Sequence, residues 1–295
     1  MTEARVAETF VETPRLRFAA LEAGAREAPL ALCLHGFPDS PWSWRQTLLS
    51  LAEDGYHAVA PFMRGYFPTE LPASGFRLSD LGEDVLALEE SLRGRSRSVA
   101  IGHDWGAAAV YVALQRDARR WACAVAASVP PTDDSIDAGS LAQLRRSWYS
   151  FLFQLPDIEV PERIAASDDM ALVDMLWSDW SPDLEAAEEI AHAKAALRPE
   201  GHLRAALSYY REAPTRPPLA RTAGEAGPLI GWDIPLLYLH GRRDGCIGVE
   251  ALARIQHRLR PTVRLAVLED AGHFLQLERA AEVNELIVEF LAQST

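Results

Sequence analysis

Several features are scarce in this chain of 295 residues, and each scarcity argues against a class of protein. No apolar run approaches the roughly 18 residues of a membrane-spanning helix. The first residues lack the basic start and the apolar stretch of a secretory signal peptide. The three cysteines are an odd number without metal-ligand spacing, which argues against a disulfide framework and against a zinc site. We therefore expect a cytoplasmic protein with no metal site and no bound cofactor.

Positive charge is scarce as well. Lysine and arginine together number 29 against 42 acidic residues, which gives a formal net charge of −13. This balance disfavours binding to nucleic acid or to anionic membrane surfaces. Lys194 is the single lysine, and such an arginine bias is more typical of a GC-rich bacterial genome than of a function. The length and the 48% hydrophobic content are typical of one globular catalytic domain that carries an insertion.

The serine motif Gly-x-Ser-x-Gly does not occur in the sequence, which argues against a serine esterase. In its place stands Gly102-His103-Asp104-Trp105-Gly106, between an apolar strand-like run and a helix-prone alanine stretch. Glycines two residues either side of a nucleophile permit the sharp strand-to-helix turn that presents the central side chain to a pocket. Because the central residue is Asp104, the predicted chemistry is displacement at a saturated carbon, giving an ester that is then hydrolysed. The structural alternative is that Asp104 only caps the following helix.

Three other polar motifs directly follow apolar, strand-like runs. They are the His-Gly-Phe-Pro motif at residues 35–38, Asp244 and His273. Open parallel sheets build their sites at the carboxyl ends of the strands, so we expect Asp104, Asp244 and His273 to meet there. The order nucleophile, acid, histidine is also the chain order of the triad in the α/β-hydrolase fold.

The strand and helix signals alternate up to about residue 131, which predicts a mainly parallel sheet covered by helices. From residue 132 to 228 the signals are mostly helical, and strand signals then resume. We therefore predict an α/β core domain formed by residues 1–131 and 229–295, with a helical cap domain, 132–228, inserted as a lid. The expected strands lie near residues 8–12, 16–22, 29–34, 57–62, 97–102, 122–128, 235–240 and 263–268, and the expected helices near 42–54, 79–93, 105–117, 138–154, 169–178, 183–197, 201–212 and 276–292.

Together these motifs resemble the epoxide hydrolases of the α/β-hydrolase fold, which are related to the haloalkane dehalogenases, and the resemblance covers the chain nearly end to end. It implies the α/β-hydrolase fold and the conversion of lipophilic epoxides to vicinal diols. Two segments of the predicted cap sharpen it. The segment 148–154 resembles the family segment that carries the first ring-opening tyrosine, and 208–211 resembles the Trp-Tyr-Arg segment that carries the second. The resemblance thus assigns these two roles to Tyr149 and Tyr210.

In the chemistry that the resemblance implies, Asp104 attacks a ring carbon while the two tyrosines stabilise the departing oxygen. His273, oriented by Asp244, then activates water to hydrolyse the ester. The backbone N–H groups of Phe37 and Trp105 are the expected oxyanion donors. The expected partners are a small epoxide and water, with the chain as a monomer or a homodimer. The side chains expected to line the substrate site are those of Phe37, Trp105, Trp148 and Phe153.

Alternatives remain open for the function and for single residues. A haloalkane or haloacid dehalogenase would use the same aspartate and would bind halide through Trp105. A non-catalytic ligand-binding protein would keep the fold without the chemistry. Asp244 could merely form a turn with the glycine that follows it, and Tyr149 could be simple packing within the cap. Cys246 is expected to be partly exposed and to have no catalytic role.

Overall fold

The computed structural model of the chain describes residues 5–94, 96–131, 140–212 and 232–294. Within these residues, eight strands form one sheet with the order β1-β2-β4-β3-β5-β6-β7-β8. The pairs β1–β2 and β2–β4 are antiparallel and the remaining pairs are parallel. The strands are β1 (Ala7–Glu12), β2 (Arg17–Ala23), β3 (Leu30–Leu34), β4 (His57–Pro61), β5 (Ser98–His103), β6 (Trp121–Ala127), β7 (Leu236–Gly241) and β8 (Val263–Leu268).

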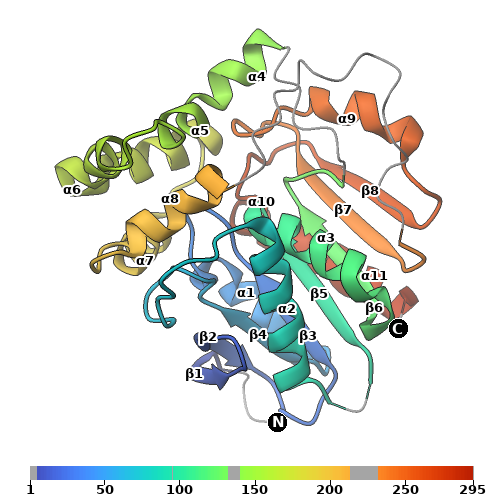
Figure 1. Ribbon diagram of the computed structural model, residues 1–295. Coiled ribbons are helices and arrows are strands. Elements are labelled where there is room, and N and C mark those ends of the chain that lie inside the picture. Colours follow the sequence, from blue (N-terminus) through green and yellow to red (C-terminus); the bar gives the residue numbers. More distant parts are fainter. Residues whose placement is uncertain (1–4, 95, 132–139, 213–231, 295) are drawn as a thin grey trace.

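The central strands are apolar on both faces, as parallel strands covered by helices must be. Every residue of β3 to β7 is buried. One face packs against α2, α3 and α9, and the other against α1 and α11, so the core consists of two apolar layers (Figure 1). The helices outside the β6–β7 connection are α1 (Arg45–Glu53), α2 (Leu78–Leu92), α3 (Trp105–Asp117), α9 (Glu250–Ile255), α10 (Leu275–Glu278) and α11 (Ala280–Ser294).

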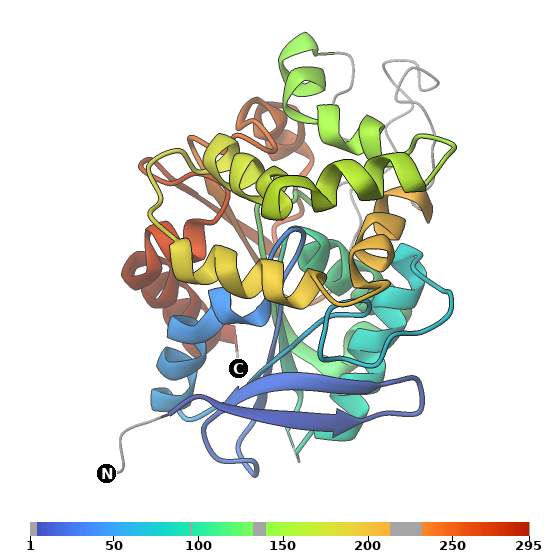
Figure 2. The same ribbon diagram turned by 90° about the vertical axis from the view of Figure 1, so that its left-hand side faces the viewer.

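In the described part of the connection between β6 and β7 lie five further helices, which we call the inserted helices. They gather on one side of the sheet, away from β1 and β2, where they face the turns that follow the parallel strands (Figures 1 and 2). None of the helices in the described residues is long and apolar enough to cross a membrane. The inserted helices are α4 (Leu141–Arg146), α5 (Trp148–Phe153), α6 (Glu159–Trp180), α7 (Ala187–Leu197) and α8 (His202–Glu212).

The predicted α/β-hydrolase fold is confirmed, and the expected strands agree with the observed ones to within about two residues. The helix expected over 138–154 is two helices, because the chain breaks at Ser147 between α4 and α5; residues 138–139 lie outside the described ones. The helix expected over 169–178 corresponds to the second part of α6, which follows a break at Ser167–Met170 where the backbone dihedral angles are not helical; the first part, from Glu159, was not expected. Pro161, a residue usually read as a helix breaker, lies in the first turn of α6, where proline is tolerated. The helix expected over 276–292 is also interrupted, at Arg279.

Candidate active site

The turn from β5 to α3 places Asp104 in a backbone conformation that few residues other than glycine adopt. Its φ is 53° and its ψ is −122°, and such a conformation persists only when the surrounding structure enforces it. A Cβ atom on Gly106 would lie 2.2 Å from the carbonyl oxygen of Leu34, so α3 approaches β3 too closely for any larger residue there. The turn therefore holds the Asp104 carboxylate rigidly beyond the end of the sheet.

The loop after β3 surrounds one oxygen of this carboxylate. The backbone N–H of Phe37 donates to Asp104 Oδ1 at 2.8 Å, and the amides of Phe37 and Trp105 both act to lower the pKa of the carboxylate. A Cβ atom on Gly36 would lie 2.2 Å from the same Oδ1, so glycine is required where this loop passes the nucleophile candidate. Of the two amides expected as oxyanion donors, that of Phe37 thus bonds Asp104 directly, and that of Trp105 lies close enough to act on its charge.

His273 lies between two carboxylates. Its Nδ1 is 3.0 Å from Asp244 Oδ2, and its Nε2 is 3.7 Å from Asp104 Oδ2. Asp244 Oδ1 accepts the backbone N–H groups of Cys246 and Ile247 at 2.7 and 2.8 Å, which fixes the carboxylate in place. Within the described part of the chain, the buried Nε2 atom has no hydrogen-bond partner. The arrangement keeps a proton on Nδ1 and directs the Nε2 lone pair toward Asp104.

The three groups shift one another's pKa values. Burial alone would lower the pKa of His273, but the Asp244 and Asp104 carboxylates outweigh it and raise that pKa. Burial would raise the pKa of Asp244, yet the adjacent imidazole holds it below its usual value. For Asp104, burial prevails over His273 and the two amides, and its pKa is raised. Asp244 therefore stays ionised as the partner of the imidazole.

The end of α6 holds together the loop after β7, which carries Asp244 and which we call the acid loop, and the loop after β8, which carries His273 and which we call the histidine loop. The carbonyl oxygen of Trp180 accepts the backbone N–H of Gly245 at 3.1 Å and that of His273 at 3.0 Å. The Trp180 ring contacts the His273 imidazole edge-to-face, with a centroid separation of 4.9 Å. Ser181 Oγ accepts the N–H of Phe274 and donates to Glu278. An inserted helix thereby positions both loops.

Two tyrosines from the inserted helices lie at the site. Tyr149 on α5 and Tyr210 on α8 are each 6% exposed, and their ring centroids are 5.6 Å apart. The pKa of each is raised, first by burial and also by the Asp104 charge, which places both rings in the field of that carboxylate. The Tyr149 hydroxyl pairs with Cys246 Sγ at 3.3 Å, whereas the buried Tyr210 hydroxyl has no hydrogen-bond partner among the described residues. By contrast, Tyr209 donates to the carbonyl oxygen of Arg64.

Three of the four expected lining side chains come together and one does not. The rings of Phe37, Trp105 and Phe153 each contact Tyr210 edge-to-face, with centroid separations of 5.3, 5.1 and 5.2 Å. Trp148 is 37% exposed, and its ring contacts only the Tyr149 ring among the aromatic pairs of the described residues. The expectation that Trp148 lines the site is therefore not met, because neighbouring residues on the short helix α5 point in different directions.

The sequence reasoning missed two residues near Asp104. Asp39 is 1% exposed and accepts hydrogen bonds from Ser40 N–H and Ser43 Oγ; burial raises its pKa to about 7. The position of Asp39 directly after the His-Gly-Phe-Pro motif is the sequence feature that could have identified it as a residue of the site. Cys246 is 3% exposed, so the expectation of partial exposure is wrong. The loop after β7 turns inward because Asp244 accepts the backbone N–H groups of Cys246 and Ile247. No pattern in the local sequence predicts that turn.

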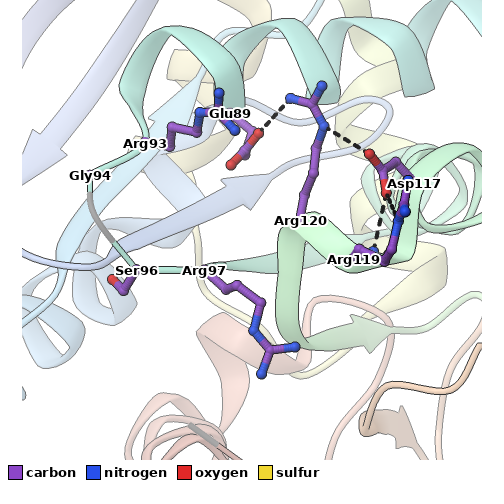
Figure 3. Close-up of a pocket in the computed structure, with 8 residues that line it drawn as sticks. All are labelled: Glu89, Arg93, Gly94, Ser96, Arg97, Asp117, Arg119 and Arg120. Atoms are coloured by element: carbon purple, nitrogen blue, oxygen red, sulfur yellow. Dashed lines mark hydrogen bonds and ion pairs between the residues drawn. The ribbon is translucent and has the colours of Figure 1, made fainter.

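A surface hollow of about 510 Å³ lies at the opposite edge of the sheet. In it, Arg120 lies between Glu89 and Asp117 and pairs with both (Figure 3). Arg97 precedes β5 whereas Asp104 follows it, so roughly 20 Å separates the hollow from Asp104 at ~3.3 Å per strand residue. Arg93, Arg119 and Arg120 pair with nearby acids, and Arg97 donates to the carbonyl oxygen of Trp121. The hollow is therefore separate from the candidate active site.

Comparison with known proteins gives a consistent result. A family model described as the alpha/beta hydrolase family matches residues 31–286. Epoxide hydrolase 3 of Xenopus tropicalis is 31% identical over 290 residues, covering 94% of this chain and 75% of that protein. Epoxide hydrolase A of Mycobacterium tuberculosis is 29% identical over 317 residues, covering 96% and 97%. The crystal structure of epoxide hydrolase A from Mycobacterium thermoresistibile is 27% identical, with a TM-score of 0.79 and 98% of both chains covered.

Proposed function

The chain belongs to the alpha/beta hydrolase family and to its epoxide hydrolases, and from this premise we propose that it converts lipophilic epoxides to vicinal diols through an ester on Asp104. The observation that carries the proposal is the meeting of three features in one buried space. These are the Asp104 carboxylate, the unpaired His273 Nε2 and the two tyrosine rings. A carboxylate nucleophile, a base and two acids are what opening a three-membered ether and releasing its product require.

In the first step, Asp104 Oδ2 attacks a ring carbon and the carbon–oxygen bond of the epoxide breaks. Oδ2 is the reacting atom because Oδ1 already accepts the Phe37 N–H and becomes the ester carbonyl oxygen. The charge that leaves on the epoxide oxygen is met by the hydroxyls of Tyr149 and Tyr210. One of these transfers its proton as the alkoxide becomes the first hydroxyl of the diol. The raised pKa values keep both tyrosines protonated for this role.

In the second step, His273 Nε2 removes a proton from water, which attacks the ester carbonyl carbon. The carbonyl oxygen carries the negative charge of the tetrahedral intermediate, and the amides of Phe37 and Trp105 stabilise it. As the intermediate collapses, the ester bond to the alkyl oxygen breaks and that oxygen takes the proton from the His273 imidazolium, which completes the diol. The proton left on the Asp104 carboxyl group returns to the tyrosinate, so that the carboxylate, the imidazole and both tyrosines are regenerated. The Asp244 carboxylate stabilises the imidazolium while it exists.

The inserted helices belong to the predicted cap, 132–228, and we assign the cap the role of a lid. They contribute both tyrosines and the Trp180 carbonyl that holds the acid and histidine loops. The aromatic contacts of Phe37, Trp105 and Phe153 favour an apolar epoxide over a charged one.

A direct assay separates this function from the dehalogenase alternative. Styrene oxide and a long-chain aliphatic epoxide are followed to diol, with halide release from 1-bromobutane measured in parallel. We expect diol without halide. Halide without diol would overturn the proposal and make Trp105 a halide ligand.

Removing the tyrosine hydroxyls is expected to slow ring opening. Tyr149→Phe and Tyr210→Phe should each lower the rate of Asp104 ester formation by about 10²-fold, and the double variant by about 10⁴-fold, since positioned acids contribute factors of this size. Stopped-flow measurement of the alkylation phase checks this. Tyr209→Phe is the matched control, because its hydroxyl bonds the Arg64 carbonyl and its loss should lower stability by about 1 kcal/mol without affecting alkylation. A double variant with full activity would assign the acid role elsewhere.

The rate of ester hydrolysis should fall as the pH is lowered, because His273 becomes protonated. This fall should occur at a pH below the pKa of His273 in the free enzyme. The Asp104 charge helps to raise the pKa of His273, and esterification removes that charge. The pKa of His273 therefore falls in the ester, which keeps the base neutral to lower pH. Single-turnover hydrolysis rates against pH, compared with an NMR titration of His273 in the free enzyme, test this. The prediction would be contradicted if the apparent pKa of the hydrolysis rate were equal to the pKa of His273 in the free enzyme or higher.

A further inference from the structure

Cys246 is a buried thiol beside the candidate nucleophile that the proposed epoxide chemistry does not use. Single ligand atoms of Asp104, Cys246 and His273 all lie within 4.8 Å of one another, although the three residues come from three separate loops. His273 supplies an independent sign of a vacant binding position. Its Nε2 atom is buried, faces this group and has no hydrogen-bond partner among the described residues, while Nδ1 is occupied by Asp244.

We propose that Asp104, Cys246 and His273 form an inhibitory binding site for a soft divalent cation such as Zn²⁺ or Cd²⁺. Carboxylate oxygen, thiolate sulfur and imidazole nitrogen are all ligands that zinc takes in proteins, commonly three from the protein with a fourth position open. A bound ion would occupy the nucleophile and the base together. The inhibition rests on the proposed function, whereas the binding does not.

The distances are close to those that such a site needs. Metal–ligand bonds of about 2.0–2.3 Å at tetrahedral angles put the ligand atoms roughly 3.4–3.6 Å apart. His273 Nε2 and Asp104 Oδ2 are already 3.7 Å apart. The separations to the Cys246 sulfur fall within 4.8 Å, so an inward movement of about 1 Å completes the set. A rotation of the Cys246 side chain away from the Tyr149 hydroxyl would supply it.

The charge of the three ligands and the hydrogen bonds that hold them in place also favour a divalent ion. When the ion binds, the Cys246 thiol loses its proton to solvent, and the thiolate and the Asp104 carboxylate together neutralise two positive charges in a buried space. Asp244 bonds the second nitrogen of His273, the outer contact that orients most metal-bound histidines. Asp244 also accepts the backbone N–H of Cys246, so one carboxylate braces two of the three ligands.

Cadmium titration of the full chain tests the proposal without depending on activity. We expect binding of one Cd²⁺ per chain by calorimetry, with a sulfur-to-cadmium charge-transfer band in the ultraviolet. Cys246→Ser should remove the band and weaken binding by about 100-fold or more, since losing even an outer contact of a metal site costs 10–100-fold. Cys33→Ala and Cys123→Ala are matched controls, because these buried thiols lie within β3 and β6, and both should keep the band.

Kinetics and spectroscopy of the unmodified chain complete the test. Cd²⁺ should raise the apparent KM for an epoxide without changing kcat, and the hard ion Mg²⁺ should not. X-ray absorption of the cadmium-loaded chain should show one sulfur with nitrogen and oxygen ligands, whether or not the variants fold. Absence of the band, a sulfur-free ligand shell, or unchanged affinity in Cys246→Ser would each overturn the site. Binding by a chain that hydrolyses no epoxide would overturn the proposed function and leave the metal site standing.

Discussion

Asp104→Ala should abolish diol formation, with a loss in kcat of at least about 10⁴-fold. Losses of this size follow the removal of a nucleophile that acts as a unit with its base. In this chain no other described carboxylate can take over from Asp104. Asp244 is held by His273 and two backbone amides, and Asp39 is held by Ser40 and Ser43. Alanine also leaves the Phe37 amide without its acceptor, so water rather than an ester would occupy that position.

The measurement is diol formation from styrene oxide by purified wild-type and Asp104→Ala chains. Thermal unfolding of both proteins shows whether the variant is folded, and intact mass after incubation with epoxide shows whether an ester forms. Substantial turnover in a folded Asp104→Ala chain would eliminate the nucleophile assignment. Loss of turnover with an unchanged unfolding midpoint would show that Asp104 is required for the reaction and not for folding.

His273→Gln should separate the two chemical steps. Ester formation does not use His273 as a base, so it should continue, while ester hydrolysis should slow by about 10²- to 10⁴-fold because no positioned base remains. The variant should therefore accumulate the alkylated form. Intact mass spectrometry should show an increase equal to the mass of the epoxide, and diol formation should be slow from the first turnover, because the diol leaves only when the ester is hydrolysed.

Two matched variants control this result. His202→Gln replaces another buried histidine, whose Nδ1 bonds the carbonyl oxygen of Gly65 away from the reacting groups, and it should turn over without an adduct. The double variant Asp104→Ala with His273→Gln should show no adduct, because it lacks the ester-forming oxygen. If His273→Gln alone showed neither adduct nor diol, the two-step mechanism would fail at its first step.

The sheet was predictable because the signals that specify it are local. The runs that became β3 to β7 are mostly apolar, as strands covered on both faces need to be, and every residue in them is buried. The inserted helices were harder to predict. Ser147 separates α4 from α5, and α6 consists of two helical stretches that Ser167–Met170 separate, where the backbone dihedral angles are not helical. Packing against neighbouring elements decides such boundaries, so no single-segment pattern contains them.

The sequence by itself determined which chemical groups the site contains and where along the chain they stand. The glycines around Asp104, the strand-like runs before Asp244 and His273, and the chain order of the three residues are all local features. Such features specify a turn or a strand end, and the common edge of a parallel sheet then brings the three residues into one region.

Only the tertiary structure decided the distances between these groups and what surrounds them. It turned Tyr210 toward Phe37 and Tyr209 toward Arg64, left Trp148 partly exposed, and brought Cys246 beside the candidate nucleophile. These outcomes depend on how α5, α6 and α8 pack over the loops, which is set by contacts between residues far apart in the chain. Sequence patterns describe each segment by itself, whereas the packing between segments fixes which face of each one meets the site.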